Sequence, residues 1–278
     1  MRGSQTIASA FNSLAVGFSL RPDRFFFVIF YILFSLWSLH LRSQSPENTP
    51  PNYTWLKRAD LPDLTVAALN TQDITIAIAT DQEGNVYTLS FGSGVDKRNS
   101  DGVITVSNFI SASQLDAPLD IAIDEEGYIY IADFLAEGDS YLDNGKIKVF
   151  SPQGNYLPER TILTSFYRPL GIDVDETKVY VAEFNDATTG PEQDQQLSRV
   201  RTYNKMNGNV VAETNNVEIP YRIAVNSGGQ VYVSQAGKND PAVLVFNNSL
   251  VLQGELPNIS SPGSVVVDPF DFVHVIEY

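Results

Sequence analysis

The chain contains no cysteine, and histidine occurs only twice, at His40 and His274. Without cysteine no disulfide can hold the fold, so a hydrophobic core must do so. A cysteine nucleophile is excluded, and so is a zinc site of the usual His/Cys type. The sequence has neither a Gly-x-Ser-x-Gly elbow nor a phosphate-binding glycine-rich loop, since Gly92-Ser93-Gly94 is too short. These absences argue against the enzymes that depend on such groups.

Basic residues are also scarce: 18 Lys and Arg stand against 33 Asp and Glu, for a formal net charge of −15. Residues 1–45 hold four arginines and one aspartate, so this leader carries +3 and the remainder −18. A surface this acidic argues against a sequence-independent grip on nucleic acid and against binding to anionic lipid. The acidity serves either solubility alone or an acid-rich ligand site.

One long apolar run stands near the start of the chain. Residues 25–41 carry no charge, Arg21 and Arg24 precede them, and a polar exit follows at residues 42–45. We interpret residues 1–45 as a secretory signal peptide or an uncleaved N-terminal anchor, because 17 residues are at the lower limit for spanning a bilayer. We therefore expect an extracytoplasmic protein, secreted or at the cell surface, that meets a membrane only through this segment.

The remainder of the chain repeats one pattern. Its copies are Asp81–Phe91, Asp124–Phe134, Asp175–Phe184, Asn226–Ala236 and Asp268–Tyr278. The strand-centre residues are Tyr87, Tyr130, Tyr180, Tyr232 and His274, spaced 42 to 52 residues apart. A period in the forties with several strands per unit is typical of β-propeller blades, and a β-sandwich with coincidental spacing is the alternative. Strands that are apolar on both faces, such as Ile121–Ile123, suit a sheet pressed between two neighbours.

The unit from Pro118 to Leu157 shows the expected strands most clearly. Ile121–Ile123 and Tyr128–Ala132 are joined by a tight turn in which Gly127 supplies the positive φ. Lys146–Phe150 is the third strand and Thr161–Phe166 the fourth. In the first unit we expect Ile74–Phe91 to hold two strands and Val103–Phe109 to be the third. The prediction is an all-β propeller of four-stranded blades with five units visible, the last one stopping after its second strand.

The phrase P-x-x-I-A-I-D-x-x-G-x-I-Y-I-A-D, followed by a strand ending in V-F, resembles the NHL repeat. Pro118–Phe150 is the closest copy, and Pro169–Tyr203 and Pro220–Phe246 are weaker ones. The chain departs from the family in having longer loops between the second and third strands. The resemblance implies an exported, bacterial-type propeller that is commonly six-bladed. WD40 repeats fit poorly, because neither Trp37 nor Trp55 closes a unit.

The resemblance also suggests how the chain is divided. Residues 46–70 read as a polar, proline-rich linker followed by a segment that could supply a ring-closing strand. Residues 71–278 form the NHL-like propeller, which is C-terminally incomplete. In that reading either the given chain is a piece of a longer protein or the 46–70 segment completes the ring.

Polar residues gather where first strands begin and second strands end, which antiparallel pairing brings to one rim. We predict a ligand-binding rim that contains Asp120, Asp133, Glu183, Arg222 and Gln235. Its loops add Glu137, Asp139, Asp143, Asp186, Glu192 and Asp194. Clustered carboxylates suit Ca²⁺, the one cofactor we consider, with Asp133, Glu183 and Glu277 as its ligands. Alternatively, Asp133 and Glu183 bond to nearby backbone amides and fix the blades.

We predict a binding or scaffold module that recognises a protein or glycan, with no nucleic-acid partner. The alternative is a metal-dependent propeller hydrolase or lactonase that uses the same carboxylates, and a third reading is a purely structural repeat. His274 is interpreted as an aromatic-substituted core position. The aromatic residues that follow the rim either pack between blades or line a ligand site; they are Phe91, Phe134, Phe184 and Tyr278.

Overall fold

The computed structural model describes residues 74–134, 145–166, 168–184, 198–215, 217–235 and 241–277. All of them belong to one compact unit, Asp60–Tyr278. The leader, the 46–70 segment and Tyr278 lie outside the described residues. No described residue belongs to a helix that is long and apolar enough to cross a membrane.

The described residues fold into five antiparallel sheets in sequence order. The first contains β1 (Ile74–Thr80), β2 (Val86–Phe91), β3 (Gly94–Arg98) and β4 (Ile104–Ile110). The second contains β5 (Pro118–Ile123), β6 (Ile129–Phe134), β7 (Gly145–Phe150) and β8 (Ile162–Phe166). Two short 3₁₀ helices, η2 (Ala112–Gln114) and η3 (Pro158–Arg160), lie in the connections.

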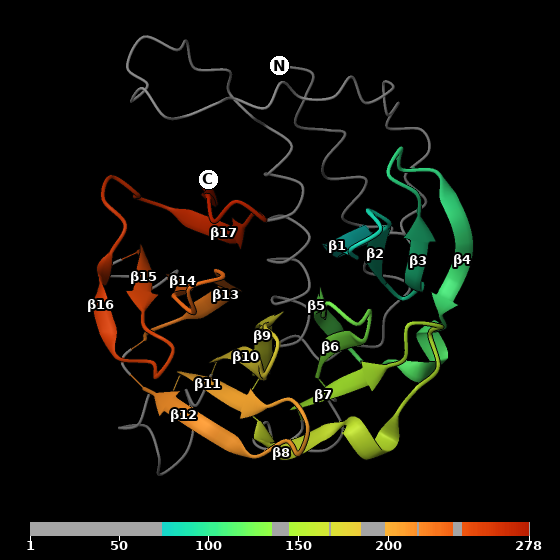
Figure 1. Ribbon diagram of the computed structural model, residues 1–278, viewed down its shortest axis with the longest axis horizontal. Helices are drawn as coiled ribbons and strands as arrows, with labels where there is room; N and C mark the ends of the chain where they lie inside the picture. Colours follow the sequence, from blue (N-terminus) through green and yellow to red (C-terminus); the bar gives the residue numbers. More distant parts are fainter. Residues whose placement is uncertain are drawn as a thin grey trace, which may run out of the picture. The chain divides into compact units, whose positions relative to one another are not determined.

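The third and fourth sheets repeat this order, and the fifth has two strands. The third contains β9 (Arg168–Val174), β10 (Lys178–Phe184), β11 (Arg199–Asn204) and β12 (Val210–Thr214). The fourth contains β13 (Pro220–Val225), β14 (Val231–Gln235), β15 (Ala242–Phe246) and β16 (Leu252–Glu255). The fifth contains β17 (Pro262–Val267) and β18 (Val273–Glu277). The sheets are arranged around a common centre, with the first strand of each sheet innermost and contacting the next first strand (Figure 1).

These sheets confirm the predicted four-stranded blades. One strand assignment was wrong: Val103–Phe109 falls on β4, the fourth strand of its blade, and β3 is the third. The pattern hid β3 because three of its five residues are charged (Asp96, Lys97 and Arg98). The predicted ring-closing strand lies outside the described residues, so the six-bladed count stays a prediction.

The hydrophobic core lies between neighbouring blades, which explains why the strands are apolar on both faces. On β6, Ile129 and Ile131 pack toward the first blade, and Tyr130 and Ala132 pack toward the third. All four are essentially inaccessible to solvent. Because burial of one such large apolar side chain is worth roughly 1.5–3 kcal/mol, this packing is the main force that holds adjacent blades together.

A turn aspartate bonded to the strand-centre residue closes the inner hairpin in four of the five blades, whereas in the fourth the Tyr232 hydroxyl donates to Gln230 instead. Asp124 accepts backbone N–H groups from Glu126 and Tyr128 with Oδ1, and the hydroxyl of Tyr130 donates to its Oδ2 at 3.0 Å. The same aspartate–tyrosine bond recurs in the first and third blades. In the fifth, His274 Nε2 lies 3.0 Å from Asp268 Oδ2. His274 thus takes the place of the tyrosine, although it is exposed rather than in a core.

Candidate functional site

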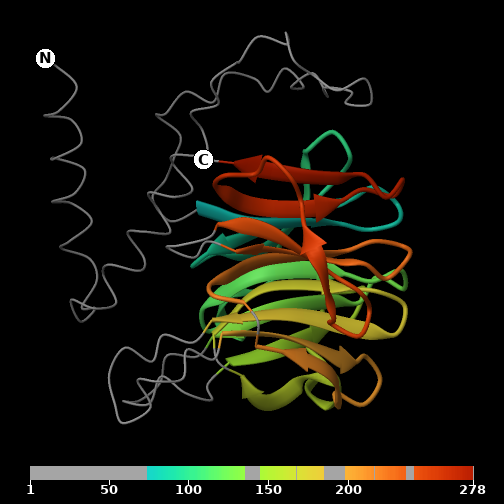
Figure 2. The same cartoon turned by 90° about the vertical axis from the view of Figure 1, so that its left-hand side faces the viewer.

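The two ends of the blades differ, and Figure 2 shows the strands running between them. We call the end with the tight β5–β6, β9–β10 and β13–β14 turns the hairpin rim. The opposite end, where β6, β10, β14 and β18 finish, is the loop rim. The strand register pairs a residue at or next to the end of each of these strands with a proline at or next to the start of the inner strand: Asp133 with Pro118, Glu183 with Pro169, Gln235 with Pro220, and Glu277 with Pro262.

Asp133 is fully buried and holds the segment that leads into β5. Its Oδ1 accepts N–H groups from Asp116 at 3.1 Å and Ala117 at 2.8 Å. Lys148 Nζ lies 2.7 Å from its Oδ2, and also 3.0 Å from Asp116. Burial alone would lower the pKa of Lys148, but its bonds to the two aspartates outweigh that effect and raise it. Asp133 therefore acts as a fixed anchor within its own blade.

Glu183 is also fully buried, and it pairs within its own sheet. Arg199 on β11 donates from Nε to Oε2 at 3.0 Å, and the Tyr203 hydroxyl donates to Oε1 at 3.1 Å. A buried carboxylate with a charge-assisted partner and a second donor is well satisfied. Glu183 therefore supports β10 and β11 from inside the blade and does not face solvent.

The two later blades repeat the anchor with different residues. Gln235 Oε1 accepts the N–H of Glu218 at 2.9 Å, and Glu277 Oε1 accepts that of Ser260 at 2.7 Å. In both cases the side chain reaches the segment that precedes its inner strand, as Asp133 does. The geometry matches the structural interpretation of these positions, in which they fix the blades.

The centre of the arrangement contains a second group of charges. Each inner strand pairs on one side only, so its other edge carries unpaired N–H and C=O groups. Asp120 on β5 accepts the N–H of Ile172, on the neighbouring inner strand, at 3.0 Å. Burial raises the pKa of Asp120, and the charge of Arg222 opposes that shift.

Arg222 on β13 joins three other blades. Its Nη1 donates to the carbonyl of Leu170 on β9 at 2.5 Å and lies 3.7 Å from Asp120 Oδ2. Its Nη2 donates to the carbonyl of Ile76 on β1 at 3.4 Å. The predicted pair Asp120 and Arg222 is therefore brought together, at the centre, whereas Asp133, Glu183 and Gln235 each work within their own blade.

Sequence reasoning missed Asp173, on β9. Its Oδ2 accepts the N–H of Val225 on β13 at 2.8 Å, which repeats the Asp120–Ile172 contact one blade further on. Burial raises its pKa to about 7, hydrogen bonds from Val225 and Val174 oppose the shift, and the charge of Asp120 adds to it. The signal was available, because Asp173 is a charged residue where the other units have alanine or valine.

No three His, Cys, Asp or Glu side chains among the described residues are placed to hold a metal ion. Asp133, Glu183 and Glu277, the predicted calcium ligands, are each engaged by protein donors, so the calcium site stays a prediction. The loop acids Glu137, Asp139, Asp143, Asp186, Glu192 and Asp194 lie outside the described residues. Of the aromatic residues at the rim, Phe91 is 37% exposed and Phe134 and Phe184 are partly buried.

Comparisons with solved structures agree with this arrangement. A chain from a nidogen/laminin complex superimposes with a TM-score of 0.57 at 19% identity, over 74% of this chain and 73% of that one. A gluconolactonase from Xanthomonas campestris gives a TM-score of 0.54 at 14% identity, over 72% and 68%. The fold is a β-propeller. A virginiamycin B lyase from Staphylococcus aureus gives 0.53 at 16% identity, over 75% and 64%.

These similarities identify the fold alone, because all three identities are below one fifth. No family model matches the chain, and no curated protein matches it. Propellers with this likeness include an enzyme of lactone chemistry, a lyase and a chain from a complex of two proteins.

Proposed function

We propose that this β-propeller is an exported, NHL-type binding or scaffold module whose loop rim is the working face. The observation that carries the proposal is the set of anchors at that rim. Asp133, Gln235 and Glu277 each hold the chain segment that enters the inner strand of their own blade, by bonds of 2.7–3.1 Å to backbone N–H groups. The backbone at the loop rim is therefore held in a fixed position by these side chains.

The connections at the two rims support this choice. At the hairpin rim the β5–β6 and β9–β10 turns are short and are closed by Asp124 and Asp175. At the loop rim the chain inserts residues 135–144 between β6 and β7 and residues 185–198 between β10 and β11. Binding residues are concentrated on loops that a rigid scaffold positions, so the longer connections favour the loop rim as the recognition surface.

The apolar run at residues 25–41 supports export, and the NHL-like phrase at Pro118–Phe150 supports the family assignment. The partner is a protein or a glycan outside the cytoplasm. One structural neighbour belongs to a complex of two proteins, which agrees with recognition as the role of such a fold.

Site-specific photo-crosslinking in the producing cells tests the proposal. A photo-reactive phenylalanine analogue replaces Glu218, exposed at the loop rim, or Glu125, exposed at the hairpin rim. The two variants lose the same charge, and thermal unfolding of each checks that the fold is kept. We expect covalent adducts from position 218 and none from position 125. Equal adducts from both rims, or none from position 218, would contradict the proposal.

A further inference from the structure

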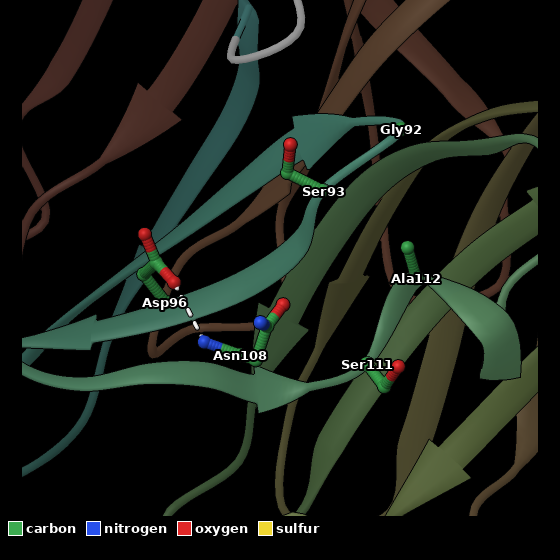
Figure 3. Close-up of a pocket in the computed structure, with 6 residues that line it drawn as sticks. All are labelled: Gly92, Ser93, Asp96, Asn108, Ser111 and Ala112. Carbon is green, nitrogen blue, oxygen red and sulfur yellow. Dashed lines mark hydrogen bonds between the residues drawn. The ribbon is translucent and has the colours of Figure 1, made fainter.

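The first blade contains a hollow that the role of the anchors does not explain. It is lined by Gly92, Ser93, Asp96, Asn108, Ser111 and Ala112 and has a volume of about 380 Å³ (Figure 3). That volume lies within the roughly 300–1,000 Å³ of small-molecule sites, but the lining is polar rather than apolar.

The hollow exists because β4 bulges away from β3. Val95 pairs with Ile110 and Lys97 with Val106, so Asp96 alone faces residues 107–109. At the end of the bulge the strands come together again: a Cβ on Gly94 would lie 2.2 Å from the carbonyl oxygen of Ile110. Bulges of this kind re-aim side chains and often occur beside functional sites.

Asn108 sits at the crest of the bulge with φ of 52°, a left-handed conformation that costs energy for any residue but glycine. The carboxylate of Asp96 accepts its N–H at 2.8 Å and holds it there. The backbone alone would be served better by glycine. Asparagine adopts this conformation more readily than most residues and, unlike glycine, also presents a side-chain amide; Asn108 is exposed.

The groups that face the hollow can both donate and accept. In the described part of the chain, the side-chain amide of Asn108 and the Oδ2 atom of Asp96 have no hydrogen-bond partner. Ser111 adds a hydroxyl, which is shared with Ser113 at 3.0 Å. One ligand hydroxyl could donate to Asp96 Oδ2, and a neighbouring hydroxyl could accept from Asn108 Nδ2.

We propose that this hollow binds the vicinal hydroxyl groups of a neutral carbohydrate. A single carboxylate among hydroxyls and an amide suits a polyol better than a divalent cation, which takes six to eight oxygen ligands when it is Ca²⁺. The inference rests on the proposed function and deepens it, because Ser93 and Ser111 lie at the loop rim of the first blade. It narrows the ligand class to a glycan. It stands on the geometry of that blade alone.

The test is an NMR titration of the full chain with methyl glycosides of glucose, galactose and mannose. We expect saturable shifts of the Ser93 and Asn108 amides with at least one sugar. Asp96→Asn and Asn108→Gly should each weaken binding at least tenfold. Asn108→Gly should unfold at the same temperature as the unchanged chain or higher, since glycine adopts this φ without strain.

Asn258→Gly is the matched control. Asn258 is also exposed and left-handed, with φ of 61°, but lies in the turn before β17. Its substitution should relieve the same strain and leave sugar binding unchanged. Three results would overturn the inference: no saturable shift with any sugar, equal affinity of the Asn108→Gly and Asn258→Gly variants, or binding of ethylammonium chloride as tight as that of the sugar. The crosslinking experiment is also carried out on the Asn108→Gly variant. Adducts from position 218 that persist in that variant would show that the proposed function can hold even where the sugar-binding inference fails.

Discussion

The guanidinium of Arg222 donates to the main-chain carbonyl of Ile76, which lies 146 residues earlier in the chain. The same side chain reaches Leu170 and the carboxylate of Asp120, so one residue of the fourth blade contacts the other three complete blades. Inner-strand edges leave carbonyl and amide groups without ladder partners, and buried polar groups of this kind must be satisfied. Arg222 supplies hydrogen-bond donors, and Asp120 and Asp173 supply acceptors. These side chains thus satisfy backbone groups at the inner strand edges that would otherwise need a further paired strand.

Replacing Arg222 by methionine should lower the free energy of unfolding by about 3–5 kcal/mol, because it leaves the buried carboxylate of Asp120 without its counter-charge. Urea denaturation at neutral pH measures the change. Arg98→Met is the control: Arg98 bonds to Thr88 and Gly102 at the outer part of one blade, and its loss should cost less than about 1 kcal/mol. Adding Asp120→Asn to Arg222→Met should recover part of the loss. Equal losses of unfolding free energy in Arg222→Met and Arg98→Met would show that the central arginine stabilises the fold no more than an outer one.

Asp173 should give the protein a pH dependence of stability. In the folded chain its carboxyl keeps a proton up to about pH 7, whereas in the unfolded chain it loses it near pH 3.8. The folded state thus binds more protons than the unfolded state between these two pH values. The contribution of Asp173 to the free energy of unfolding therefore falls as the pH rises from about 4 to 7, and it is constant at higher pH. At about 1.4 kcal/mol per pKa unit the fall is at most about 4 kcal/mol, an upper limit because Asp173 keeps some contact with solvent.

Asp173→Asn should reduce the slope between pH 4 and 7, as measured by urea denaturation at several pH values. Burial also raises the pKa of Asp120, which therefore keeps a smaller slope of the same sign in this variant. Asp101→Asn, at an exposed turn, is the control and should leave the curve unchanged. Asp116 and Asp175 act in the opposite direction. Burial alone would raise their pKa values, but hydrogen bonds from Lys148 and Tyr180 hold them below the usual range, so their stabilisation is lost below about pH 4 in both variants. An unchanged slope in Asp173→Asn would disprove the assignment.

The hairpins and the order of strands could be predicted from the sequence, because they depend on local signals. Asp124 and Gly127 specify a turn, and the continuous apolar run around Tyr130 specifies a strand that is buried on both faces. The strand β3 could not be found this way, since Asp96, Lys97 and Arg98 make it resemble a loop. It forms because β2 offers a partner edge across the tight turn at Gly92-Ser93.

The roles of the candidate site residues were harder to predict. Asp120 and Asp173 each bond to a residue 52 positions later, so their partners appear only once the blades are set in register. The sequence placed Asp133 and Glu183 at one rim correctly. It could not show that Lys148 and Arg199, on the third strands, turn toward them and take up their charge.

The carboxylates at the loop rim should stabilise the fold with or without calcium. Asp133→Asn should lower the free energy of unfolding by about 3 kcal/mol, because Lys148 then remains buried without its fully buried carboxylate partner. The loss should be the same in calcium chloride and in EDTA, as measured by thermal unfolding. Glu125→Gln, on the exposed hairpin rim, is the control and should change little. A calcium-dependent rise in the melting temperature that Glu183→Gln abolishes would instead establish the predicted metal site.

Gly171 should set how closely the third and fourth blades approach. A Cβ at this position would lie 2.9 Å from both Arg222 Cα and the carbonyl oxygen of Tyr221, and backbone atoms cannot move aside cheaply. Gly171→Ala should therefore cost about 1–3 kcal/mol in urea denaturation, although alanine normally suits a strand better than glycine.

Gly228→Ala provides the comparison, because a Cβ there would meet only the Asn226 side chain, at 3.4 Å. That variant should be neutral or slightly stabilised. Since Arg222 and the Asp173–Val225 bond both depend on the distance between β9 and β13, Gly171→Ala should also flatten the pH dependence that Asp173 produces. A Gly171→Ala protein as stable as Gly228→Ala, with the full pH dependence kept, would mean that the two blades can separate without disturbing the central charges.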